Sequence, residues 1–460
     1  MTFRDPFAIA LGGLLLIWPA LANGYPLLFV DTGAFLDQAL RPFMLWDKPW
    51  VYGPALVAVS LKWSLWPAAL AQGWLVSWTI WRVGLVFWPP MPAAHVAICF
   101  VLALGSAAPW FAALTMPDIF APLTVLSLFV LAFAPDGRRW PVVVLASFAI
   151  AAHLAHLAVA LACVALVVLL KPRAAARTAL PLVLAASVLM ATNVIGHGRF
   201  GLSPFGSVFA LARLTADGPA RTWLEQVCPD PDLAMCAWIG RLPADSDIFL
   251  WSPDGPVWTH PGGPIALAPE ASRIVAATLR SQPWPVARDA LRNTVAQFFW
   301  VRLGVTTGAR FLDEAIGTRL RTWYPPEELE RFMSSRQRDG RMGDPYGRLR
   351  DAHTIGLVAG AFAMLVLGAR AWRRDPVFFA LVASIAAGLA ANAFATGALS
   401  GPADRYQSRI VWLVLLPPSL AVARKTWHLL NARSDGKNNR EAAKCAAEPS
   451  LPARRWPPEA

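Results

Sequence analysis

The sequence has few charged residues. Of its 460 residues only 15% are Asp, Glu, Lys or Arg, while 56% are hydrophobic. Soluble globular domains carry about 25% charged residues, and the mean hydropathy of +0.45 also argues against a soluble protein. A helix that spans a bilayer needs about 20 mostly apolar residues. Because many stretches of this sequence qualify, we predict an all-α polytopic membrane protein.

Motifs for nucleotide chemistry are also lacking. The sequence contains no Walker A motif, no Gly-rich nucleotide fingerprint and no Ser-His-Asp order, which argues against a nucleotide-driven cytosolic enzyme. Its net charge of +12 and its pI near 10.1 could suggest nucleic-acid binding. Many basic residues, however, lie in short loops between apolar runs, where lysine and arginine fix membrane topology. We therefore expect no nucleic-acid partner.

The apolar runs predict about ten transmembrane helices. The first run resembles a cleavable signal peptide, but Asp5 interrupts its basic region, so we expect an uncleaved helix. The fifth and sixth runs are short and are interrupted by HLAHLA (153–158), which favours a hairpin over one long tilted helix. The runs cover residues 7–23, 66–88, 92–111, 118–134, 140–155, 157–170, 178–197, 354–370, 376–398 and 409–423.

Short basic loops orient these helices. With ten crossings and a cytoplasmic N-terminus, all of these loops fall in the cytoplasm, as the positive-inside rule requires. They contain Arg138 and Arg139, then Lys171, Arg173 and Arg177, then Arg370, Arg373 and Arg374, and finally Arg424 and Lys425. We therefore expect both termini in the cytoplasm.

This topology divides the chain into domains. Residues 1–198 form an N-terminal transmembrane bundle, whose first external loop covers residues 24–65. Residues 199–352 form a small external, mostly helical cap, and residues 353–430 form the C-terminal transmembrane helices. Residues 431–460 are polar and charged, which predicts a disordered cytosolic tail.

The chain contains five cysteines. Cys228 and Cys236 are the pair in the external segment, where an oxidising environment would let them form a disulfide. The alternative is two unpaired thiols in a loop. Cys99 and Cys163 lie in apolar runs and Cys445 lies in the tail.

Carboxylates at the external helix ends are candidates for a functional site. Asp31 directly follows the apolar stretch PLLFV, and Asp118 precedes another apolar run. An Asp at the centre of a bilayer costs roughly 2.5–3.5 kcal/mol, so both should lie at the interface. Apolar surroundings would raise the pKa of Asp31 and make it a general base. Asp118 could orient an acceptor or help to hold a cation; alternatively, it is an ordinary N-cap.

Three segments carry a resemblance to a known family. FVDTGAFLDQALRPFMLWDKPWVYGPALV (29–57) resembles the first external loop of the GT-C membrane glycosyltransferases. TMPDIFAP (115–122) is similar to their second acidic motif, and GPADRYQSRIVWLVLLP (401–417) resembles the Arg-Tyr-x-x-Arg opening of a late helix in bacterial members. The resemblance implies a GT-C-like bundle, and it does not assign the cap.

The resemblance also implies a reaction. A hexosyl or pentosyl group passes, with inversion, from a polyprenyl-phosphate donor to a glycan, lipid or protein acceptor. The active site lies on the periplasmic side of a bacterial inner membrane, in cell-envelope synthesis. Asp31 is the implied catalytic base. Arg405 and Arg409, which share one helix face, are implied to bind the departing phosphate; alternatively, they anchor the helix at the lipid headgroups. Asp118 and Tyr406 are further candidates for substrate binding.

Other residues of the first external loop are weaker candidates for substrate binding. Asp37 could be an ordinary helix-end acid. Arg41 and Lys48 could bind phosphate or extend toward lipid headgroups. Tyr52 could bind the same phosphate or belong to an aromatic belt.

Metal binding is left open. His153 and His156 could chelate a metal or form an interfacial polar pair. The first motif is a lone Asp followed by Thr-Gly, unlike the Asp-x-Asp of some family members. We therefore assign no metal ligands and treat Mg²⁺ or Mn²⁺ as an optional cofactor.

Two other functions remain as alternatives. A transporter or flippase of lipid-linked saccharides predicts internal repeats and broken helices with polar centres in mid-membrane, and no repeat is evident. A non-catalytic membrane protein of envelope assembly predicts that Asp31→Asn has no effect.

Overall fold

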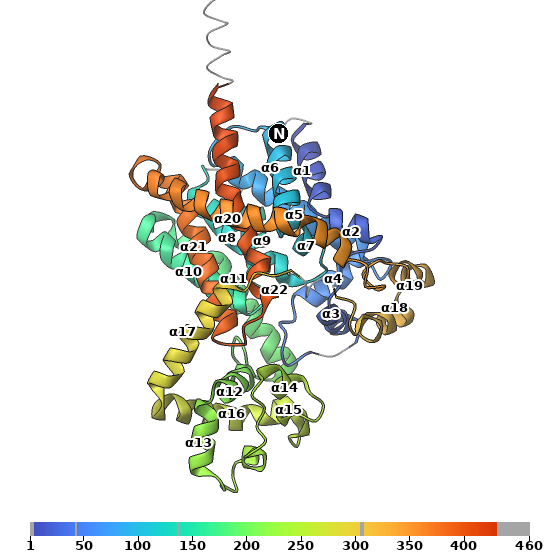
Figure 1. Cartoon of the computed structure of the whole chain (residues 1–460), viewed down its shortest axis with the longest axis vertical. Coiled ribbons are helices and arrows are strands. Elements are labelled where there is room, and N and C mark those ends of the chain that lie inside the picture. Colours follow the sequence, from blue (N-terminus) through green and yellow to red (C-terminus); the bar gives the residue numbers. More distant parts are fainter. Residues whose placement is uncertain (1–3, 42–43, 136–138, 304–307, 430–460) are drawn as a thin grey trace, which may run out of the picture.

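The computed structural model describes residues 4–41, 44–135, 139–303 and 308–429. Regular structure in these residues is helical, apart from one isolated parallel β-bridge between Leu27 and Leu114. Figure 1 shows a helical bundle, with a smaller helical domain at one end of it. The tail at 431–460 lies outside the described residues.

The N-terminal half of the bundle surrounds one central helix, α8 (Phe120–Phe133). All but one of its residues are buried, because it is apolar on every side and packs against α5, α9, α10 and α21. The surrounding helices of this half are α1 (Arg4–Leu15), α2 (Trp18–Asn23), α5 (Trp66–Gly84), α6 (Pro92–Gly105), α7 (Ala108–Ala112), α9 (Trp140–Ala151), α10 (Ala155–Leu170) and α11 (Ala175–His197).

Among the residues that the structure describes, three helices are long and apolar enough to cross a membrane. They are Pro172–His197, Gly347–Arg374 and Pro376–Gly397. The other apolar helices are shorter. The run predicted at 7–23 is divided between α1 and α2, and the hairpin region forms two separate helices, α9 and α10, of about 18 and 24 Å. These helices are compatible with a helical membrane protein. That the chain crosses the membrane ten times remains a prediction.

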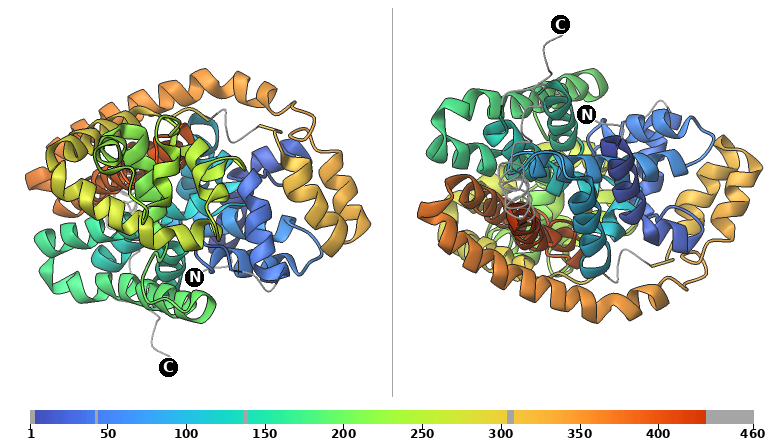
Figure 2. Two further views of the ribbon diagram at one scale, coloured as in Figure 1. Left: turned by 90° about the horizontal axis from the view of Figure 1, so that it is seen from below. Right: turned by 90° about the horizontal axis from the view of Figure 1, so that it is seen from above.

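The C-terminal half adds two long helices to the bundle, α20 (Gly343–Arg374) and α21 (Pro376–Gly397). The first begins at Gly343, not near residue 354 as the hydropathy predicted, because its polar first turns lie outside the apolar run. In both views of Figure 2, α20 runs along one side of the molecule. The chain ends its described part with α22 (Asp404–Val411), a 3-10 turn (Trp412–Leu415) and helical residues 416–429.

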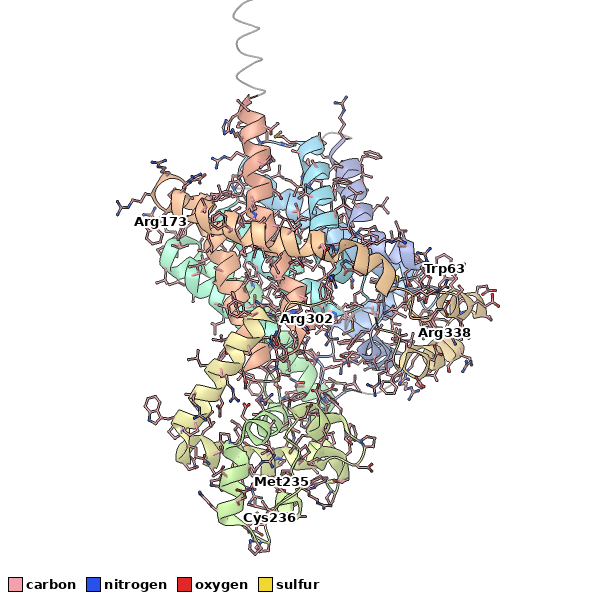
Figure 3. The ribbon with its side chains drawn as sticks, viewed as in Figure 1. Trp63, Arg173, Met235, Cys236, Arg302 and Arg338 are labelled. Atoms are coloured by element: carbon pink, nitrogen blue, oxygen red, sulfur yellow. A yellow bond between two sulfur atoms is a disulfide. The ribbon has the colours of Figure 1, made fainter. Side chains whose placement is uncertain are left out.

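A cap domain has a hydrophobic core of its own. It consists of α12 (Gly206–Asp217), α13 (Pro219–Val227), α14 (Ser246–Trp251), α15 (Pro256–Thr259) and α16 (Gly263–Ser281). A disulfide joins Cys228 to Cys236, and Figure 3 labels Cys236 at the far tip of this domain. Helix α17 (Pro283–Phe299) then returns the chain to the bundle, where it packs against α21.

The rest of the predicted cap belongs to the bundle. Residues 308–342, here called the lateral segment, contain a π-helical turn (Asp313–Gly317), α18 (Thr318–Trp323) and α19 (Pro326–Met333). Their buried residues, such as Ile316 and Phe332, join the bundle core. The predicted unit 199–352 is therefore two structures, because its two halves bury their apolar residues against different partners.

The described chain ends lie at the same end of the molecule. In Figure 1 the start of α1 and the helical residues 416–429 are at the top, and the cap domain is at the bottom. Arg173, one of the basic loop residues, also lies in the upper half (Figure 3). That the basic loops and the cap domain lie on opposite sides of a membrane stays a prediction.

Candidate functional site

The isolated β-bridge brings the two candidate carboxylates together. The N–H of Leu27 donates to the carbonyl of Ala113 (2.9 Å), and the N–H of Thr115 donates to the carbonyl of Leu27 (2.9 Å). Each carboxylate follows a bridged residue by four positions: Asp31 follows Leu27, and Asp118 follows Leu114. Two segments far apart in sequence therefore present their acids side by side.

Both carboxylates lie in the first turn of a helix. Asp31 is the second residue of α3 (Val30–Leu40), and Asp118 lies in the 3-10 turn Pro117–Ile119 that leads into α8. The positive end of a helix dipole favours an ionised carboxylate at such positions. Asp118 makes no N-capping bond, which differs from its predicted alternative role. Its Oδ1 instead faces two arginines.

Those arginines come from the start of α22. Nη2 of Arg405 lies 3.6 Å from Oδ2 of Asp31, and Nε of Arg405 lies 3.7 Å from Oδ1 of Asp118. Nη1 of Arg409 lies 3.5 Å from the same oxygen of Asp118. The four residues that the sequence placed at one external mouth thus meet in one cluster.

Lys48 completes this charge cluster. Its Nζ lies 3.4 Å from Oδ1 of Asp31, and it also bonds the carboxylate of Asp47. The ammonium group lies over the ring of Trp251 from the cap domain, 5.6 Å from the ring centroid. A cation over an aromatic face is attracted by the ring quadrupole. Lys48 therefore connects the cluster to the cap domain.

Exposure divides the cluster into an open front and a buried back. The side chains of Asp31, Lys48 and Arg405 are 32%, 14% and 10% exposed. Those of Asp118 and Arg409 are 2% and 0% exposed. A ligand can therefore reach the first three directly, whereas Asp118 and Arg409 act from behind them.

The acidity of Asp31 differs from the sequence prediction. Burial raises the pKa of its carboxyl group, but the positive charges of Lys48 and Arg405 outweigh burial and hold the pKa below its ordinary value. Burial lowers the pKa values of Lys48 and Arg405, but nearby acids outweigh it and raise both: chiefly Asp31 for Lys48 and Asp118 for Arg405. With this arrangement Asp31 is a weak base, since two cations stabilise its ionised form.

The buried back of the cluster has incomplete hydrogen bonding. Within the described part of the chain, Oδ1 of Asp118, Nη1 of Arg405, and Nε and Nη1 of Arg409 have no hydrogen-bond partner. Nη2 of Arg409 donates to Oδ1 of Asn392 (3.0 Å). The ring of Tyr406 lies 5.4 and 5.5 Å from the guanidinium carbons of Arg405 and Arg409. This spare donor capacity suits an anion, because guanidinium groups bind phosphate through several N–H groups.

Two candidates of the first loop, Asp37 and Arg41, pair outside the cluster, and a third, Tyr52, lies close enough for the charge of Asp118 to act on its hydroxyl. Asp37 pairs with Arg319 of the lateral segment (2.5 Å) and with Arg41 (3.2 Å). The hydroxyl of Tyr52 donates to Oε1 of Gln72 (2.8 Å) in the bundle core. The structure therefore gives Asp37, Arg41 and Tyr52 structural partners and does not bring them to Asp31.

The histidine pair forms no larger metal-binding group. The rings of His153 and His156 stack with centroids 5.2 Å apart, and His156 bonds the carbonyl of Ala149 through Nδ1. Among the described residues, no three or more His, Cys, Asp or Glu side chains gather to hold a metal. In the charge cluster both carboxylates face cationic groups, so these residues do not fit Mg²⁺ or Mn²⁺, which prefer free oxygen ligands.

Sequence reasoning missed the amide side chains around the cluster. Asn392 and Gln72 are lone polar residues within apolar runs, and both are buried. Gln72 donates to the carbonyls of Ala112 and Leu114, next to the β-bridge. A polar side chain within a membrane helix is costly and marks a functional or structural contact, and this signal could have identified them.

Comparison with known protein families, curated proteins and solved structures finds no match for this chain.

Proposed function

We propose that this chain is a membrane-embedded inverting glycosyltransferase. It transfers a sugar from a polyprenyl-phosphate donor to a glycan, lipid or protein acceptor on the periplasmic side of a bacterial inner membrane, in cell-envelope synthesis. The observation that carries the proposal is the charge cluster of Asp31, Lys48, Asp118, Arg405 and Arg409. It combines a carboxylate that can accept a proton with cations that can bind a phosphate.

The proposed reaction is a single displacement. The acceptor hydroxyl oxygen attacks the anomeric carbon, and Asp31 takes the hydroxyl proton. The bond between the anomeric carbon and the phosphate oxygen breaks, and its electron pair stays on the departing lipid phosphate. Lys48 and Arg405 stabilise that negative charge through charge-assisted hydrogen bonds. Asp118 holds Arg405 in place from behind, and Arg409 pairs with the same oxygen of Asp118.

Donor binding would activate the base. Lys48 and Arg405 each lie against one oxygen of Asp31, and they lower its pKa. A bound phosphate competes for both cations and adds a negative charge beside the carboxylate, which raises the proton affinity of Asp31. The base then becomes strong only when the donor is present.

The position of the cluster also bears on the alternatives. A transporter is expected to bind its substrate near the middle of the membrane, between repeats. Here the charged residues lie at the ends of helices, beside the cap domain, and Asp31 is partly exposed. An assembly protein without catalysis has no need for a carboxylate between two cations. The arrangement therefore favours the enzyme.

Sugar transfer from a panel of synthetic polyprenyl-phosphate sugars by purified protein tests this proposal. Replacement of Asp31 by Asn should lower kcat by about 10²–10⁴-fold, because this is the usual contribution of a general base. Asp313→Asn is the control, since that carboxylate is half exposed and pairs with Arg338 at the surface. Equal turnover by Asp31→Asn and wild type would remove Asp31 as the base. No transfer by the wild-type protein from any donor would reject the glycosyltransferase.

A further inference from the structure

Two buried glutamines bond the main chain just before the charged residues of the site. Gln337 of the lateral segment accepts the N–H of Leu28 at Oε1 (2.9 Å) and donates from Nε2 to the carbonyl of Leu28 (2.7 Å). Its side chain is buried, with the residue 1% exposed. Asp31 follows three residues later.

Gln297 of α17 makes the same pair of bonds with Ala403. Its Oε1 accepts the N–H of Ala403 (2.8 Å), and its Nε2 donates to the carbonyl of Ala403 (2.9 Å). Gln297 is fully buried. Arg405 follows two residues later. Gln337 and Gln297 therefore hold the main chain just before Asp31 and Arg405. The charged groups of these two residues lie 3.6 Å apart in the charge cluster.

A primary amide suits this task because it donates and accepts at once. Ala403 is the N-cap residue of α22 and has extended backbone angles (φ −148°, ψ 140°). Its carbonyl accepts the N–H of Tyr406 (3.1 Å) in the first turn of the helix and has a second lone pair for Gln297. Buried main-chain groups need hydrogen bonds, and each glutamine bonds both the N–H and the carbonyl of one residue, Leu28 or Ala403. Each glutamine amide thus bonds both main-chain groups of one residue, as a neighbouring β-strand does along its length.

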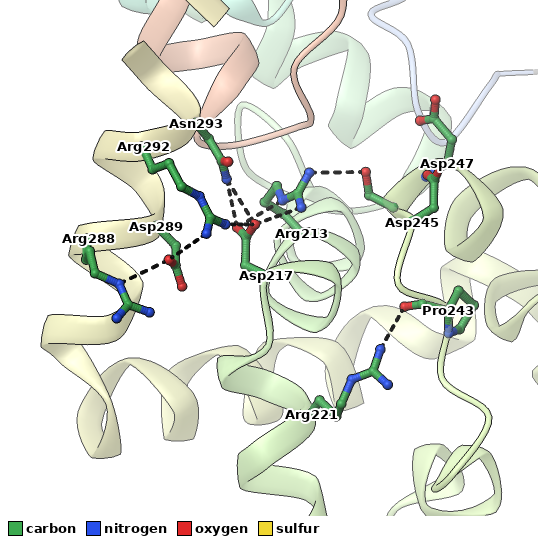
Figure 4. Close-up of polar contacts among 11 residues, drawn as sticks. Arg213, Asp217, Arg221, Pro243, Asp245, Asp247, Arg288, Asp289, Arg292 and Asn293 are labelled. Atoms are coloured by element: carbon green, nitrogen blue, oxygen red, sulfur yellow. Dashed lines mark hydrogen bonds and ion pairs between the residues drawn. The ribbon is translucent and has the colours of Figure 1, made fainter. Parts of the chain in front are cut away.

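Gln297 is also tied to the cap domain. Residues 289, 293 and 297 lie on one buried face of α17, and Nδ2 of Asn293 donates to both oxygens of Asp217 at the end of α12 (3.1 and 2.9 Å). Arg213 bonds the same carboxylate (2.8 Å), as Figure 4 shows. A Cβ atom at Gly397 would lie 2.5 Å from the carbonyl of Asn293, so α17 packs tightly on α21.

We propose that Gln297 and Gln337 are positioning residues, which fix the separation of Arg405 and Asp31 through the main chain of Ala403 and Leu28. The inference rests on the proposed function, because the separation matters for phosphate binding and proton transfer. Through Asn293 and Asp217, the contact of Gln297 also makes the placement of Arg405 depend on the cap domain. The cap domain is then part of the active site's framework, and it touches the cluster itself through Trp251.

Substitution of Gln297 by Leu and by Glu tests the proposal. Leu removes both hydrogen bonds, and Arg405 is then no longer held; a displacement of about 1 Å can cost about 10²-fold in rate, so kcat/KM should fall by up to that factor. Protonated Glu donates and accepts as Gln does, whereas ionised Glu only accepts. The ratio of the activity of Gln297→Glu to that of wild type should therefore be highest at low pH and fall as the pH rises. A purely steric role of Gln297 would not produce this pH dependence.

Hydrogen exchange of residues 403–408 gives a second readout that needs no sugar transfer. Exchange should become faster in Gln297→Leu and stay unchanged in the control Gln282→Leu. Gln282 lies at the start of the same helix and donates to the carbonyl of Pro219, remote from Ala403. If wild type transfers no sugar, the proposed function fails, while exchange still decides whether the amide holds this segment. Wild-type exchange in Gln297→Leu, or a constant activity ratio for Gln297→Glu at all pH values, would overturn the proposal.

Discussion

Replacement of Asp118 by Asn should destabilise the protein strongly, although the two side chains have the same shape. Oδ1 of Asp118 lies 3.5 Å from Nη1 of Arg409, which is fully buried. At an effective dielectric constant of 20, one such pair attracts with about 5 kcal/mol. Burial of the two charges offsets much of that gain. Removal of one partner of a buried pair nevertheless costs about 3–5 kcal/mol, because the other charge is left uncompensated.

The net loss should lie at the lower end of this range. Arg405 retains Asp31 as a second partner at 3.6 Å, and Arg409 retains its bond to Asn392. We therefore expect the free energy of unfolding to fall by about 3 kcal/mol. Unfolding in mixed micelles with increasing denaturing detergent, followed by the fluorescence of the 22 tryptophans, measures this change.

A double variant separates the charge effect from packing. Asp118→Asn with Arg409→Gln removes both charges, so its loss of stability should be smaller than the sum of the two single losses by about 1–3 kcal/mol. Losses that simply add, or an Asp118→Asn protein as stable as wild type, would refute the view that the two residues form a buried pair.

Two further predictions concern the front of the site. Lys48→Gln removes one of the two cations that lower the pKa of Asp31, so the acid limb of the pH profile of kcat/KM should move to higher pH; an unchanged limb would contradict the assignment of Asp31 as base. Gly33→Ala adds a Cβ atom 2.1 Å from the carbonyl oxygen of Ala315, which should separate α3 from the lateral segment and lower stability by about 1–3 kcal/mol. The control Gly347→Ala meets no atom within 4 Å and lies within α20, where Ala favours the helix, so it should be at least as stable as wild type in the same detergent titration.

The cluster could be predicted in part from the sequence. Hydropathy predicted a helical protein. The positive-inside rule then placed four residues at helix ends on the same side of the membrane, namely Asp31, Asp118, Arg405 and Arg409. Their mutual contact is what the structure adds. The sequence does not predict that Lys48 belongs to the cluster, because the local sequence does not reveal that its ammonium group reaches Asp31.

The acidity of Asp31 shows why charge effects escape such reasoning. Apolar flanking residues indicate burial, which raises the pKa of a carboxyl group. Two cations from distant segments reverse that effect, and their distances of 3.4 and 3.6 Å are set by tertiary packing. The sign of the shift therefore depends on contacts that no local window contains.

Composition and periodicity alone determined that this chain forms apolar helices, where their polar ends lie, and which residues could carry charge chemistry, because these properties belong to each segment by itself. Tertiary structure alone decided which ends meet. The Leu27–Leu114 bridge, the two glutamine contacts and the division of residues 199–352 between two cores all join segments that are far apart in sequence. Hydrogen bonds and ion pairs act over a few ångströms, so only the folded chain can specify them.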